Sequence, residues 1–128
     1  MVGLVILSHS RNIIEGLKEL IGEMAQDVKV YGVGGTQEGH LGSDFERTQQ
    51  AIEDAYTEEG VIVLFDLGST YMTAEMVIEG LPEEKKEKVK LIDAPLLEGG
   101  ITAAVSISAG LSIDDVISSL VPLKIGKL

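Results

Sequence analysis

The chain opens with Met1-Val2-Gly3-Leu4-Val5-Ile6-Leu7-Ser8-His9-Ser10, a short apolar run that stops at a histidine between two serines. A run of this length, rich in branched residues and ended by small polar ones, is typical of a buried parallel strand. In open α/β folds, ligands bind just beyond the carboxyl ends of such strands. The first predicted strand therefore brings an imidazole to the sheet edge where this architecture places its chemistry.

Strand and helix patterns alternate along the rest of the chain. Apolar residues at helical spacing separate apolar runs that predict strands over residues 2–7, 28–33, 61–65 and 88–92. Alternating units of this kind imply a three-layer α/β/α fold, in which helices cover both faces of an open, mainly parallel sheet of four strands. Segment 121–128 either pairs as an extra edge strand or frays. The whole chain, 1–128, is expected to form a single domain.

Local signals place the helix ends and the helix faces. Ser43 and Glu46 have the spacing of a capping box, which predicts that Ser43 caps the second helix. Met72 and Met76 stand four residues apart on the third helix, a spacing that indicates packing in the core or in a dimer contact rather than ligand binding. A loop is expected over 95–100, before a buried helix.

Charge and composition argue against several classes of protein. The net charge of −11 would repel nucleic acid. The absence of cysteine excludes a disulfide framework and thiolate metal sites. The amino-terminal apolar run is shorter than a signal core, and no stretch approaches the roughly 20 apolar residues that span a membrane. We therefore expect a cytoplasmic protein that binds neither nucleic acid nor membrane.

The loops after the first and third predicted strands should lie side by side in this topology. They carry Ser8-His9-Ser10 and Asp66-Leu67-Gly68-Ser69-Thr70. A histidine nucleophile needs one neutral ring nitrogen facing its substrate, and it gains basicity and a fixed tautomer when the other nitrogen donates to a carboxylate. We expect Asp66 to orient the His9 imidazole in this way. A role as cap of the following helix is an alternative for Asp66, and the two roles are compatible.

The small polar residues around this pair suit a phosphoryl group. The first amides of the third helix, from Gly68, Ser69 and Thr70, would form an anion site, and the hydroxyl groups of Ser8 and Ser10 can bind phosphoryl oxygens. The chain has only two arginines and no lysine in either loop, whereas histidine-type phosphatases surround the phosphate with several arginines. This scarcity of cations favours a site that passes the phosphoryl group onward.

Five stretches resemble the mannose-type enzyme IIA domains of bacterial phosphotransferase systems. They are Leu4-Val5-Ile6-Leu7-Ser8-His9-Ser10, Glu15-Gly16-Leu17, 39–43, Val63-Leu64-Phe65-Asp66-Leu67-Gly68-Ser69 and Ala94-Pro95-Leu96-Leu97-Glu98-Gly99. The resemblance covers essentially the whole chain. Sugar-transporting relatives carry a longer Gly-Gly-Ser-Pro loop after the aspartate, whereas here a single Gly68 precedes Ser69. The shorter loop favours the branch that serves dihydroxyacetone kinases.

The resemblance implies a phosphoryl relay. His9 matches the histidine that the phosphocarrier protein HPr phosphorylates on Nε2, and Asp66 matches the carboxylate on the other ring nitrogen. The phosphoryl group would pass to ADP on a separate kinase subunit, DhaL, and the ATP formed would phosphorylate dihydroxyacetone bound to DhaK. No cofactor is expected on this subunit, since ADP, ATP and magnesium would belong to DhaL. Family members are homodimers, and HPr is expected to come from outside this chain.

In-line transfer requires an exposed imidazole and close docking of the partner, so the rim around His9 should be open and partly apolar. Arg11, Thr36 and Gly39 are the candidate rim residues.

Two other functions fit these residues. One is an enzyme IIA of a mannose-family sugar transporter, which shares the chemistry and differs in its acceptor, a IIB component. The other is a non-catalytic flavodoxin-like module, either a flavin carrier or a receiver domain phosphorylated on Asp66. Scarce aromatics argue against flavin, and a receiver needs acidic residues after the first strand to bind magnesium, where this chain has Ser8-His9-Ser10.

Overall fold

Four parallel strands form one sheet in the order β2-β1-β3-β4. The computed structural model describes residues 1–127 and places the strands at β1 (Gly3–Ser8), β2 (Val30–Gly34), β3 (Val61–Phe65) and β4 (Val89–Ile92). The central strands β1 and β3 are buried along their whole length, because helices cover both of their faces. The predicted α/β class and the four-stranded parallel sheet are confirmed.

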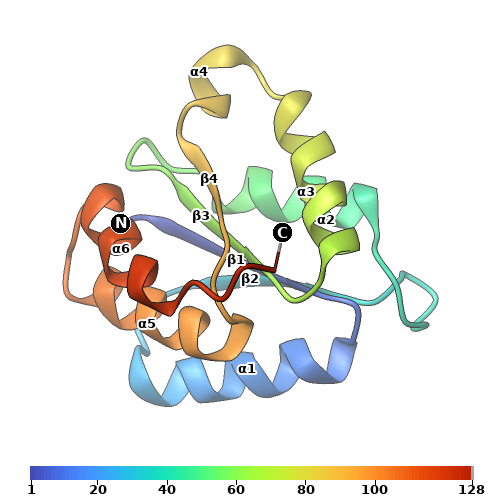
Figure 1. Ribbon diagram of the computed structural model, residues 1–128, viewed down its shortest axis with the longest axis horizontal. Helices are drawn as coiled ribbons and strands as arrows, with labels where there is room; N and C mark the ends of the chain where they lie inside the picture. The colour runs from blue at the N-terminus through green and yellow to red at the C-terminus, as the bar shows by residue number, and fades with distance from the viewer. Residues whose placement is uncertain (128) are drawn as a thin grey trace.

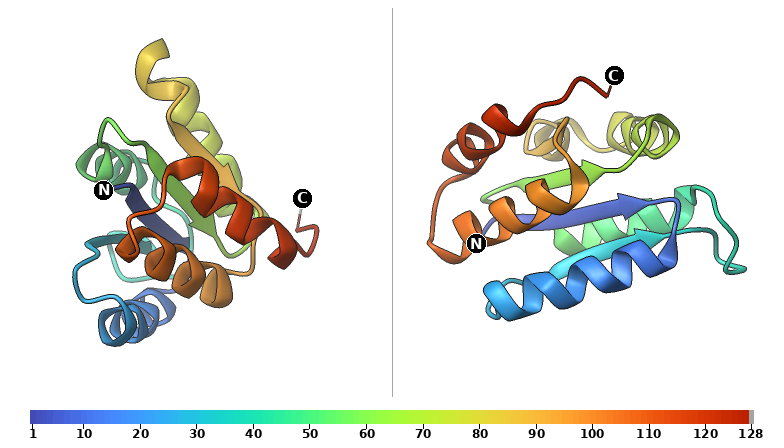
Figure 2. Two further views of the ribbon diagram at one scale, coloured as in Figure 1. Left: turned by 90° about the vertical axis from the view of Figure 1, so that its left-hand side faces the viewer. Right: turned by 60° about the horizontal axis from the view of Figure 1, so that its bottom comes forward.

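The helices form two layers, one on each face of the sheet (Figures 1 and 2). The first layer contains α1 (Arg11–Met24), α5 (Leu96–Ser108) and α6 (Ile113–Leu120). The second contains α2 (Phe45–Ala55) and α3 (Gly68–Glu79). A short helix, α4 (Glu83–Lys86), precedes β4, and a 3₁₀ turn, η1 (Val121–Leu123), follows α6. Among residues 1–127, no helix has both the length and the apolar character needed to cross a membrane.

Each layer of helices has its own apolar core. Successive side chains of a strand point to opposite faces, so Leu4 and Ile6 pack toward α1 and α5 while Val5 and Leu7 pack toward α2 and α3. All four side chains are at most 2% exposed. This packing holds β1 rigidly and thereby fixes the position of the residue that follows it, His9.

Three local expectations differ from the structure. Asp44, not Ser43, caps α2: its carboxylate accepts the Arg47 amide at 3.0 Å, which leaves the buried Ser43 hydroxyl without a partner. Met72 and Met76 are each 63% exposed, so the prediction that they pack inside the subunit is wrong. Small side chains fill that face of α3 instead.

The third difference is that segment 95–100, expected as a loop, forms the first turn of α5. Its two glycines allow close packing rather than a turn: a Cβ on Gly99 would lie 3.1 Å from the Ala94 Cβ, and one on Gly100 would lie 3.2 Å from Leu17. An edge strand or fraying was expected for segment 121–128. Its first three residues form η1, and residues 124–127 form no strand and run toward the carboxyl ends of the strands (Figure 2, right), while Leu128 lies outside the described residues.

Candidate active site

The central strands bring His9 and Asp66 together, as the topology predicts. Leu7 of β1 lies opposite Phe65 of β3, and the Asp66 amide donates to the Leu7 carbonyl at 3.1 Å. The residue that follows each strand therefore stands beside the residue that follows the other. This is the carboxyl edge of the sheet, where open α/β folds bind their ligands.

The Asp66 carboxylate accepts five hydrogen bonds. Its Oδ1 accepts from His9 Nδ1 at 3.1 Å, from the Leu67 amide at 2.7 Å and from Thr70 Oγ1 at 3.0 Å. Its Oδ2 accepts from Ser8 Oγ at 2.8 Å and from the His9 amide at 3.0 Å. Burial alone would raise the pKa of Asp66, but these hydrogen bonds outweigh it and lower the pKa below its ordinary value. Asp66 is therefore a fixed negative charge at neutral pH.

The His9 imidazole is oriented by this carboxylate. Because the Asp66 carboxylate can only accept a hydrogen bond, Nδ1 is the ring nitrogen that donates in this contact. Nε2 points away from Asp66 and contacts the hydroxyl group of Ser69, which can donate to it. The His9 side chain is 24% exposed. The structure thus turns Nε2 of His9 away from the carboxylate and toward the protein surface.

Two of the residues expected at a phosphoryl group, Ser8 and Thr70, use their hydroxyl groups to hold Asp66. Ser8 is 2% exposed, donates to Asp66 and accepts the Ser10 amide at 3.0 Å. Thr70 is 4% exposed and donates to Asp66 Oδ1 and to the Leu67 carbonyl at 2.8 Å. The Ser8 hydroxyl was expected to bind a phosphoryl oxygen, but it donates to Asp66 instead. Thr70 was expected at the anion site through its backbone amide, which stays a prediction, and its hydroxyl supports the same carboxylate.

The other three expected residues lie at helix ends beside His9. Ser10 caps α1 and accepts the Ile13 amide at 3.4 Å. Gly68 and Ser69 begin α3 and are exposed. The N-cap position of α3 is Leu67, which has no side-chain cap. The first amides of a helix lack intrahelical partners, so those at the start of α3 are suited to bind an anion.

The loop after β2 packs against the backbone of the site. The Gly35 amide donates to the Ser8 carbonyl, and the Gly42 amide donates to the His9 carbonyl, each at 3.1 Å. Gly35 has φ +71°, and a Cβ there would lie 2.5 Å from the His40 carbonyl oxygen, so the close approach requires glycine. The predicted rim residues Thr36 and Gly39 belong to this loop.

The third rim candidate, Arg11, is exposed at the start of α1. Arg11 does not line the groove of about 440 Å³ that begins at the next residue, Asn12, reaches Asp66 and runs between α1 and α5. The groove is apolar: Ile13 is 52% exposed, Leu20 45% and Leu97 48%. Asp66 lines this open, apolar groove, whereas His9 does not. The docking rim expected around His9 stays a prediction.

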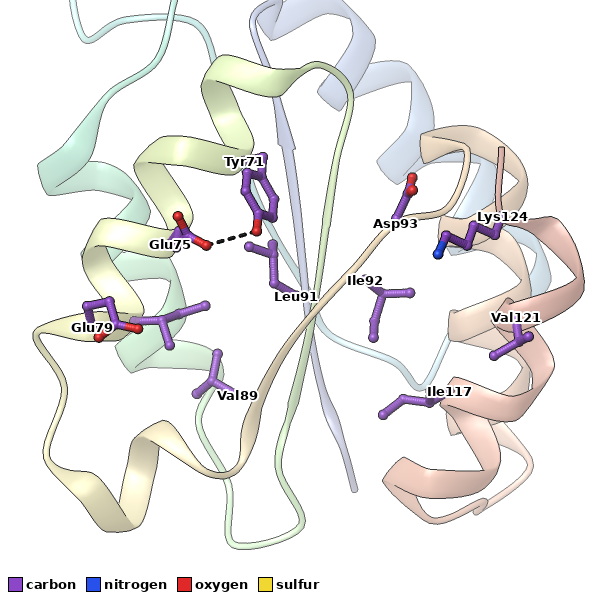
Figure 3. Close-up of a pocket in the computed structure, with 11 residues that line it drawn as sticks. Tyr71, Glu75, Glu79, Val89, Leu91, Ile92, Asp93, Ile117, Val121 and Lys124 are labelled. Atoms are coloured by element: carbon purple, nitrogen blue, oxygen red, sulfur yellow. Dashed lines mark hydrogen bonds between the residues drawn. The ribbon is translucent and has the colours of Figure 1, made fainter. Parts of the chain in front are cut away.

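A second groove runs along β4 between α3 and α6 (Figure 3). Its wall includes Tyr71, whose hydroxyl donates to Glu75 at 2.8 Å, and its far end reaches Asp93 and Lys124. Neither His9 nor Asp66 lines this groove. Within residues 1–127, no group of three histidine, cysteine, aspartate or glutamate side chains is placed to hold a metal ion.

Lys127 is a site neighbour that sequence reasoning missed. Its ammonium group contacts the Phe65 carbonyl and lies 4.0 Å from the centroid of the Phe65 ring, and its amide donates to Asp93 at 3.2 Å. Burial lowers the pKa of Lys127, against the opposing effect of Asp93 and Asp66. The contact joins residues 62 positions apart and belongs to no motif, so only the folded chain reveals it.

Comparison with known proteins gives consistent matches. Residues 3–117 match the model of the family described as the PTS system fructose IIA component. The phosphoryl donor subunit DhaM of PEP-dependent dihydroxyacetone kinase 2 from Listeria innocua is 42% identical over 106 residues, which cover 82% of this chain and 85% of that subunit. The phosphotransferase subunit DhaM of the PTS-dependent dihydroxyacetone kinase from Lactococcus lactis is 34% identical over 125 residues, 98% of each chain.

Solved structures share the fold. A protein described as being of unknown function, EF1359, superposes with a TM-score of 0.85 at 27% identity over 98% of both chains. The phosphotransferase system component EIIA from Streptococcus agalactiae gives a TM-score of 0.70 at 18% identity, covering 95% of this chain and 91% of that one. At the latter identity the likeness concerns the fold alone.

Proposed function

The chain belongs to the mannose-type enzyme IIA family, in its DhaM branch, and we propose that it is the phosphoryl donor subunit of a dihydroxyacetone kinase. His9 is the residue proposed to carry the phosphoryl group. The observation that carries the proposal is the orientation of His9, whose Nδ1 donates to Asp66 while Nε2 faces outward. The names of the relatives, with high coverage of both chains, support the kinase as the destination of the phosphoryl group.

Phosphorylation of His9 is a displacement at phosphorus. The lone pair on Nε2 attacks the phosphorus atom of the donor, the N–P bond of the donor phosphohistidine breaks, and its electron pair returns to the donor imidazole. The proton on Nδ1 stays on His9 and keeps donating to Asp66. The carboxylate therefore stabilises the positive charge that develops on the ring during transfer.

Ser69 changes partner during this step. In the free protein its hydroxyl occupies the lone pair of Nε2. When Nε2 bonds to phosphorus, the hydroxyl becomes free to donate to a phosphoryl oxygen, together with the first amides of α3 at Gly68 and Ser69. Ser8 and Thr70 act indirectly, because their hydroxyl groups hold the Asp66 carboxylate that orients the His9 ring.

We propose HPr as the donor and ADP bound to DhaL as the acceptor. A terminal phosphate oxygen of ADP attacks phosphorus, the N–P bond on His9 breaks, and Nε2 recovers its lone pair, so that ATP forms on DhaL and serves dihydroxyacetone on DhaK. ADP and magnesium are held by DhaL in this proposal, and the present chain acts as a homodimer. The open apolar groove beside Asp66 supports a site that macromolecular partners cover in turn.

The test is phosphoryl transfer from ³²P-labelled HPr, followed by a choice of acceptors. His9→Ala should abolish labelling, whereas His40→Ala, which changes the exposed histidine of the loop after β2, should be labelled like the wild type. The labelled protein should lose its phosphate to ADP-loaded DhaL and keep it in the presence of a sugar-specific IIB component. Retained labelling of the His9→Ala variant refutes the mechanism, and transfer to IIB alone assigns the chain to sugar transport.

A further inference from the structure

A half-buried lysine, Lys127, lies beside the candidate active site. Lys127 reaches the carboxyl edge of the sheet from the segment after η1, and its ammonium group contacts the carbonyl of Phe65, the peptide unit that joins Phe65 to Asp66. The side chain lies over the Phe65 ring, which is fully buried. Its amide is tied to Asp93, just after β4, so the backbone and the side chain of Lys127 are both held.

The charges around Lys127 are otherwise negative. The charged groups that face it are Asp66, after β3, and Asp93, after β4, and the chain as a whole carries −11. Phosphorylation of His9 adds roughly two further negative charges at the same edge of the sheet. A partly buried cation is screened less by salt than a surface lysine, so its attraction acts on that added charge with little attenuation.

We propose that Lys127 is a positioning residue for the His9–Asp66 pair: its ammonium group fixes the peptide that carries Asp66 and offsets the negative charge that His9 gains on phosphorylation. The inference rests on the proposed function, because it requires that His9 carries a phosphoryl group. It explains how a site with no cation in its own loops can hold a dianionic group. Lys127 acts through Phe65 and Asp66 and does not need to touch the phosphoryl group.

The experiment compares three variants of the full chain, each equilibrated with ³²P-phosphorylated HPr. Lys127→Met removes the charge and keeps an unbranched side chain, Lys127→Arg keeps the charge, and Lys124→Met removes an exposed lysine from the same segment. We expect Lys127→Met to lower the equilibrium ratio of phosphorylated to free protein by about three- to tenfold, the size of one partly screened charge interaction. Lys127→Arg should restore most of the ratio, and Lys124→Met should match the wild type.

A pH series separates charge from packing. Because burial lowers the pKa of Lys127, the wild-type ratio should fall at high pH as this lysine loses its proton, whereas Lys127→Arg should keep its ratio. Any titration of the donor, HPr, is the same in both series. A difference between the pH profiles of the two proteins is therefore caused by the side chain at position 127. This comparison also decides the question if Lys127→Met does not fold.

The outcomes separate this inference from the function on which it rests. A wild-type chain that takes no label on His9 overturns the proposed function itself. A labelled wild type with an unchanged Lys127→Met variant, or with Lys127→Arg as impaired as Lys127→Met, overturns the positioning role and leaves the relay standing. The predicted pattern is a loss in Lys127→Met, recovery in Lys127→Arg and a flatter pH profile for the arginine variant.

Discussion

At the scale of single residues, the site depends on the Asp66 carboxylate, whose two oxygens accept five hydrogen bonds. Asp66 receives the ring and the amide of His9, two hydroxyls and the Leu67 amide. The position of Asp66 beside His9 could be predicted from the sequence, because parallel strands end at one edge. The roles of Ser8 and Thr70 could not, since a hydroxyl next to a site can face the ligand or the supporting carboxylate, and only packing decides which.

Replacing Asp66 with alanine should slow phosphorylation of His9 by HPr by about 10- to 100-fold, the usual cost of removing a group that orients a functional imidazole. The ring loses its fixed tautomer and the stabilisation of its developing charge. The rate is measured by single-turnover transfer of ³²P, with circular dichroism to confirm the fold. A transfer rate equal to that of the wild type would reduce Asp66 to a support for the start of α3.

The lowered pKa of Asp66 makes folding stability depend on acidity. The contribution of Asp66 to the free energy of unfolding is fully present above the ordinary aspartate pKa of about 4. It is lost as the pH falls through the lower pKa of the folded state, because the unfolded chain binds the proton more tightly than the folded chain does. Urea denaturation at a series of acidic pH values should show a loss of unfolding free energy in that window. The Asp66→Ala variant should show a smaller loss, and equal pH dependence of the two proteins would disprove the linkage.

At the scale of elements, the apolar pattern predicts the strands better than it predicts the helices. Apolar runs located all four strands, most clearly β3, which is buried on both faces and apolar at every position. Segment 95–100 was expected as a loop, yet it begins α5, and its glycines at 99 and 100 let this helix pack closely against Ala94 and Leu17. Met72 and Met76 were misplaced because α3 turns Thr70, Ala74 and Val77 toward the core and leaves both methionines exposed.

Gly34 at the end of β2 sets how closely α1 begins beside the sheet. A Cβ at this position would lie 2.6 Å from the Arg11 Cα and 2.7 Å from the Ser10 carbonyl oxygen. Gly34→Ala should therefore destabilise the fold by about 1–3 kcal/mol, as overpacking does. The matched control is Gly22→Ala in α1, where a Cβ meets nothing within 4 Å and helix propensity should instead add about 0.5–1 kcal/mol. Chemical denaturation measures both, and equal stabilities would contradict the packing argument.

At the scale of the whole molecule, an acidic chain presents an apolar groove beside its proposed nucleophile. The groove lies between α1 and α5, and sequence spacing alone did not reveal it, because the periodicity of α1 predicts one apolar face while the structure leaves Ile13 and Leu20 half exposed. The position of Lys127 could not be predicted from the sequence either. The tertiary fold brings this lysine to the site, and no local sequence pattern indicates the contact.

Leu97 tests the docking role of this groove. Leu97→Gln should weaken the encounter with HPr and raise the KM for phosphoryl transfer by about 3- to 10-fold, since about 1 kcal/mol is a typical cost of truncating an apolar contact at an interface. The hydrolysis rate of the isolated phosphoprotein should not change. Val105→Gln, at an equally exposed position of α5 outside the groove, is the control. Equal KM values for the two variants would place the docking surface elsewhere.

The central claim is that the fold presents Nε2 of His9, and not Nδ1, to the phosphoryl donor. ¹⁵N and ³¹P NMR of the protein after phosphorylation by HPr identifies the modified atom directly. The account predicts a single phosphorylated residue, His9, with phosphorus bonded to Nε2 and the proton retained on Nδ1. Phosphorus on Nδ1, on His40 or as an acyl phosphate on Asp66 would contradict it.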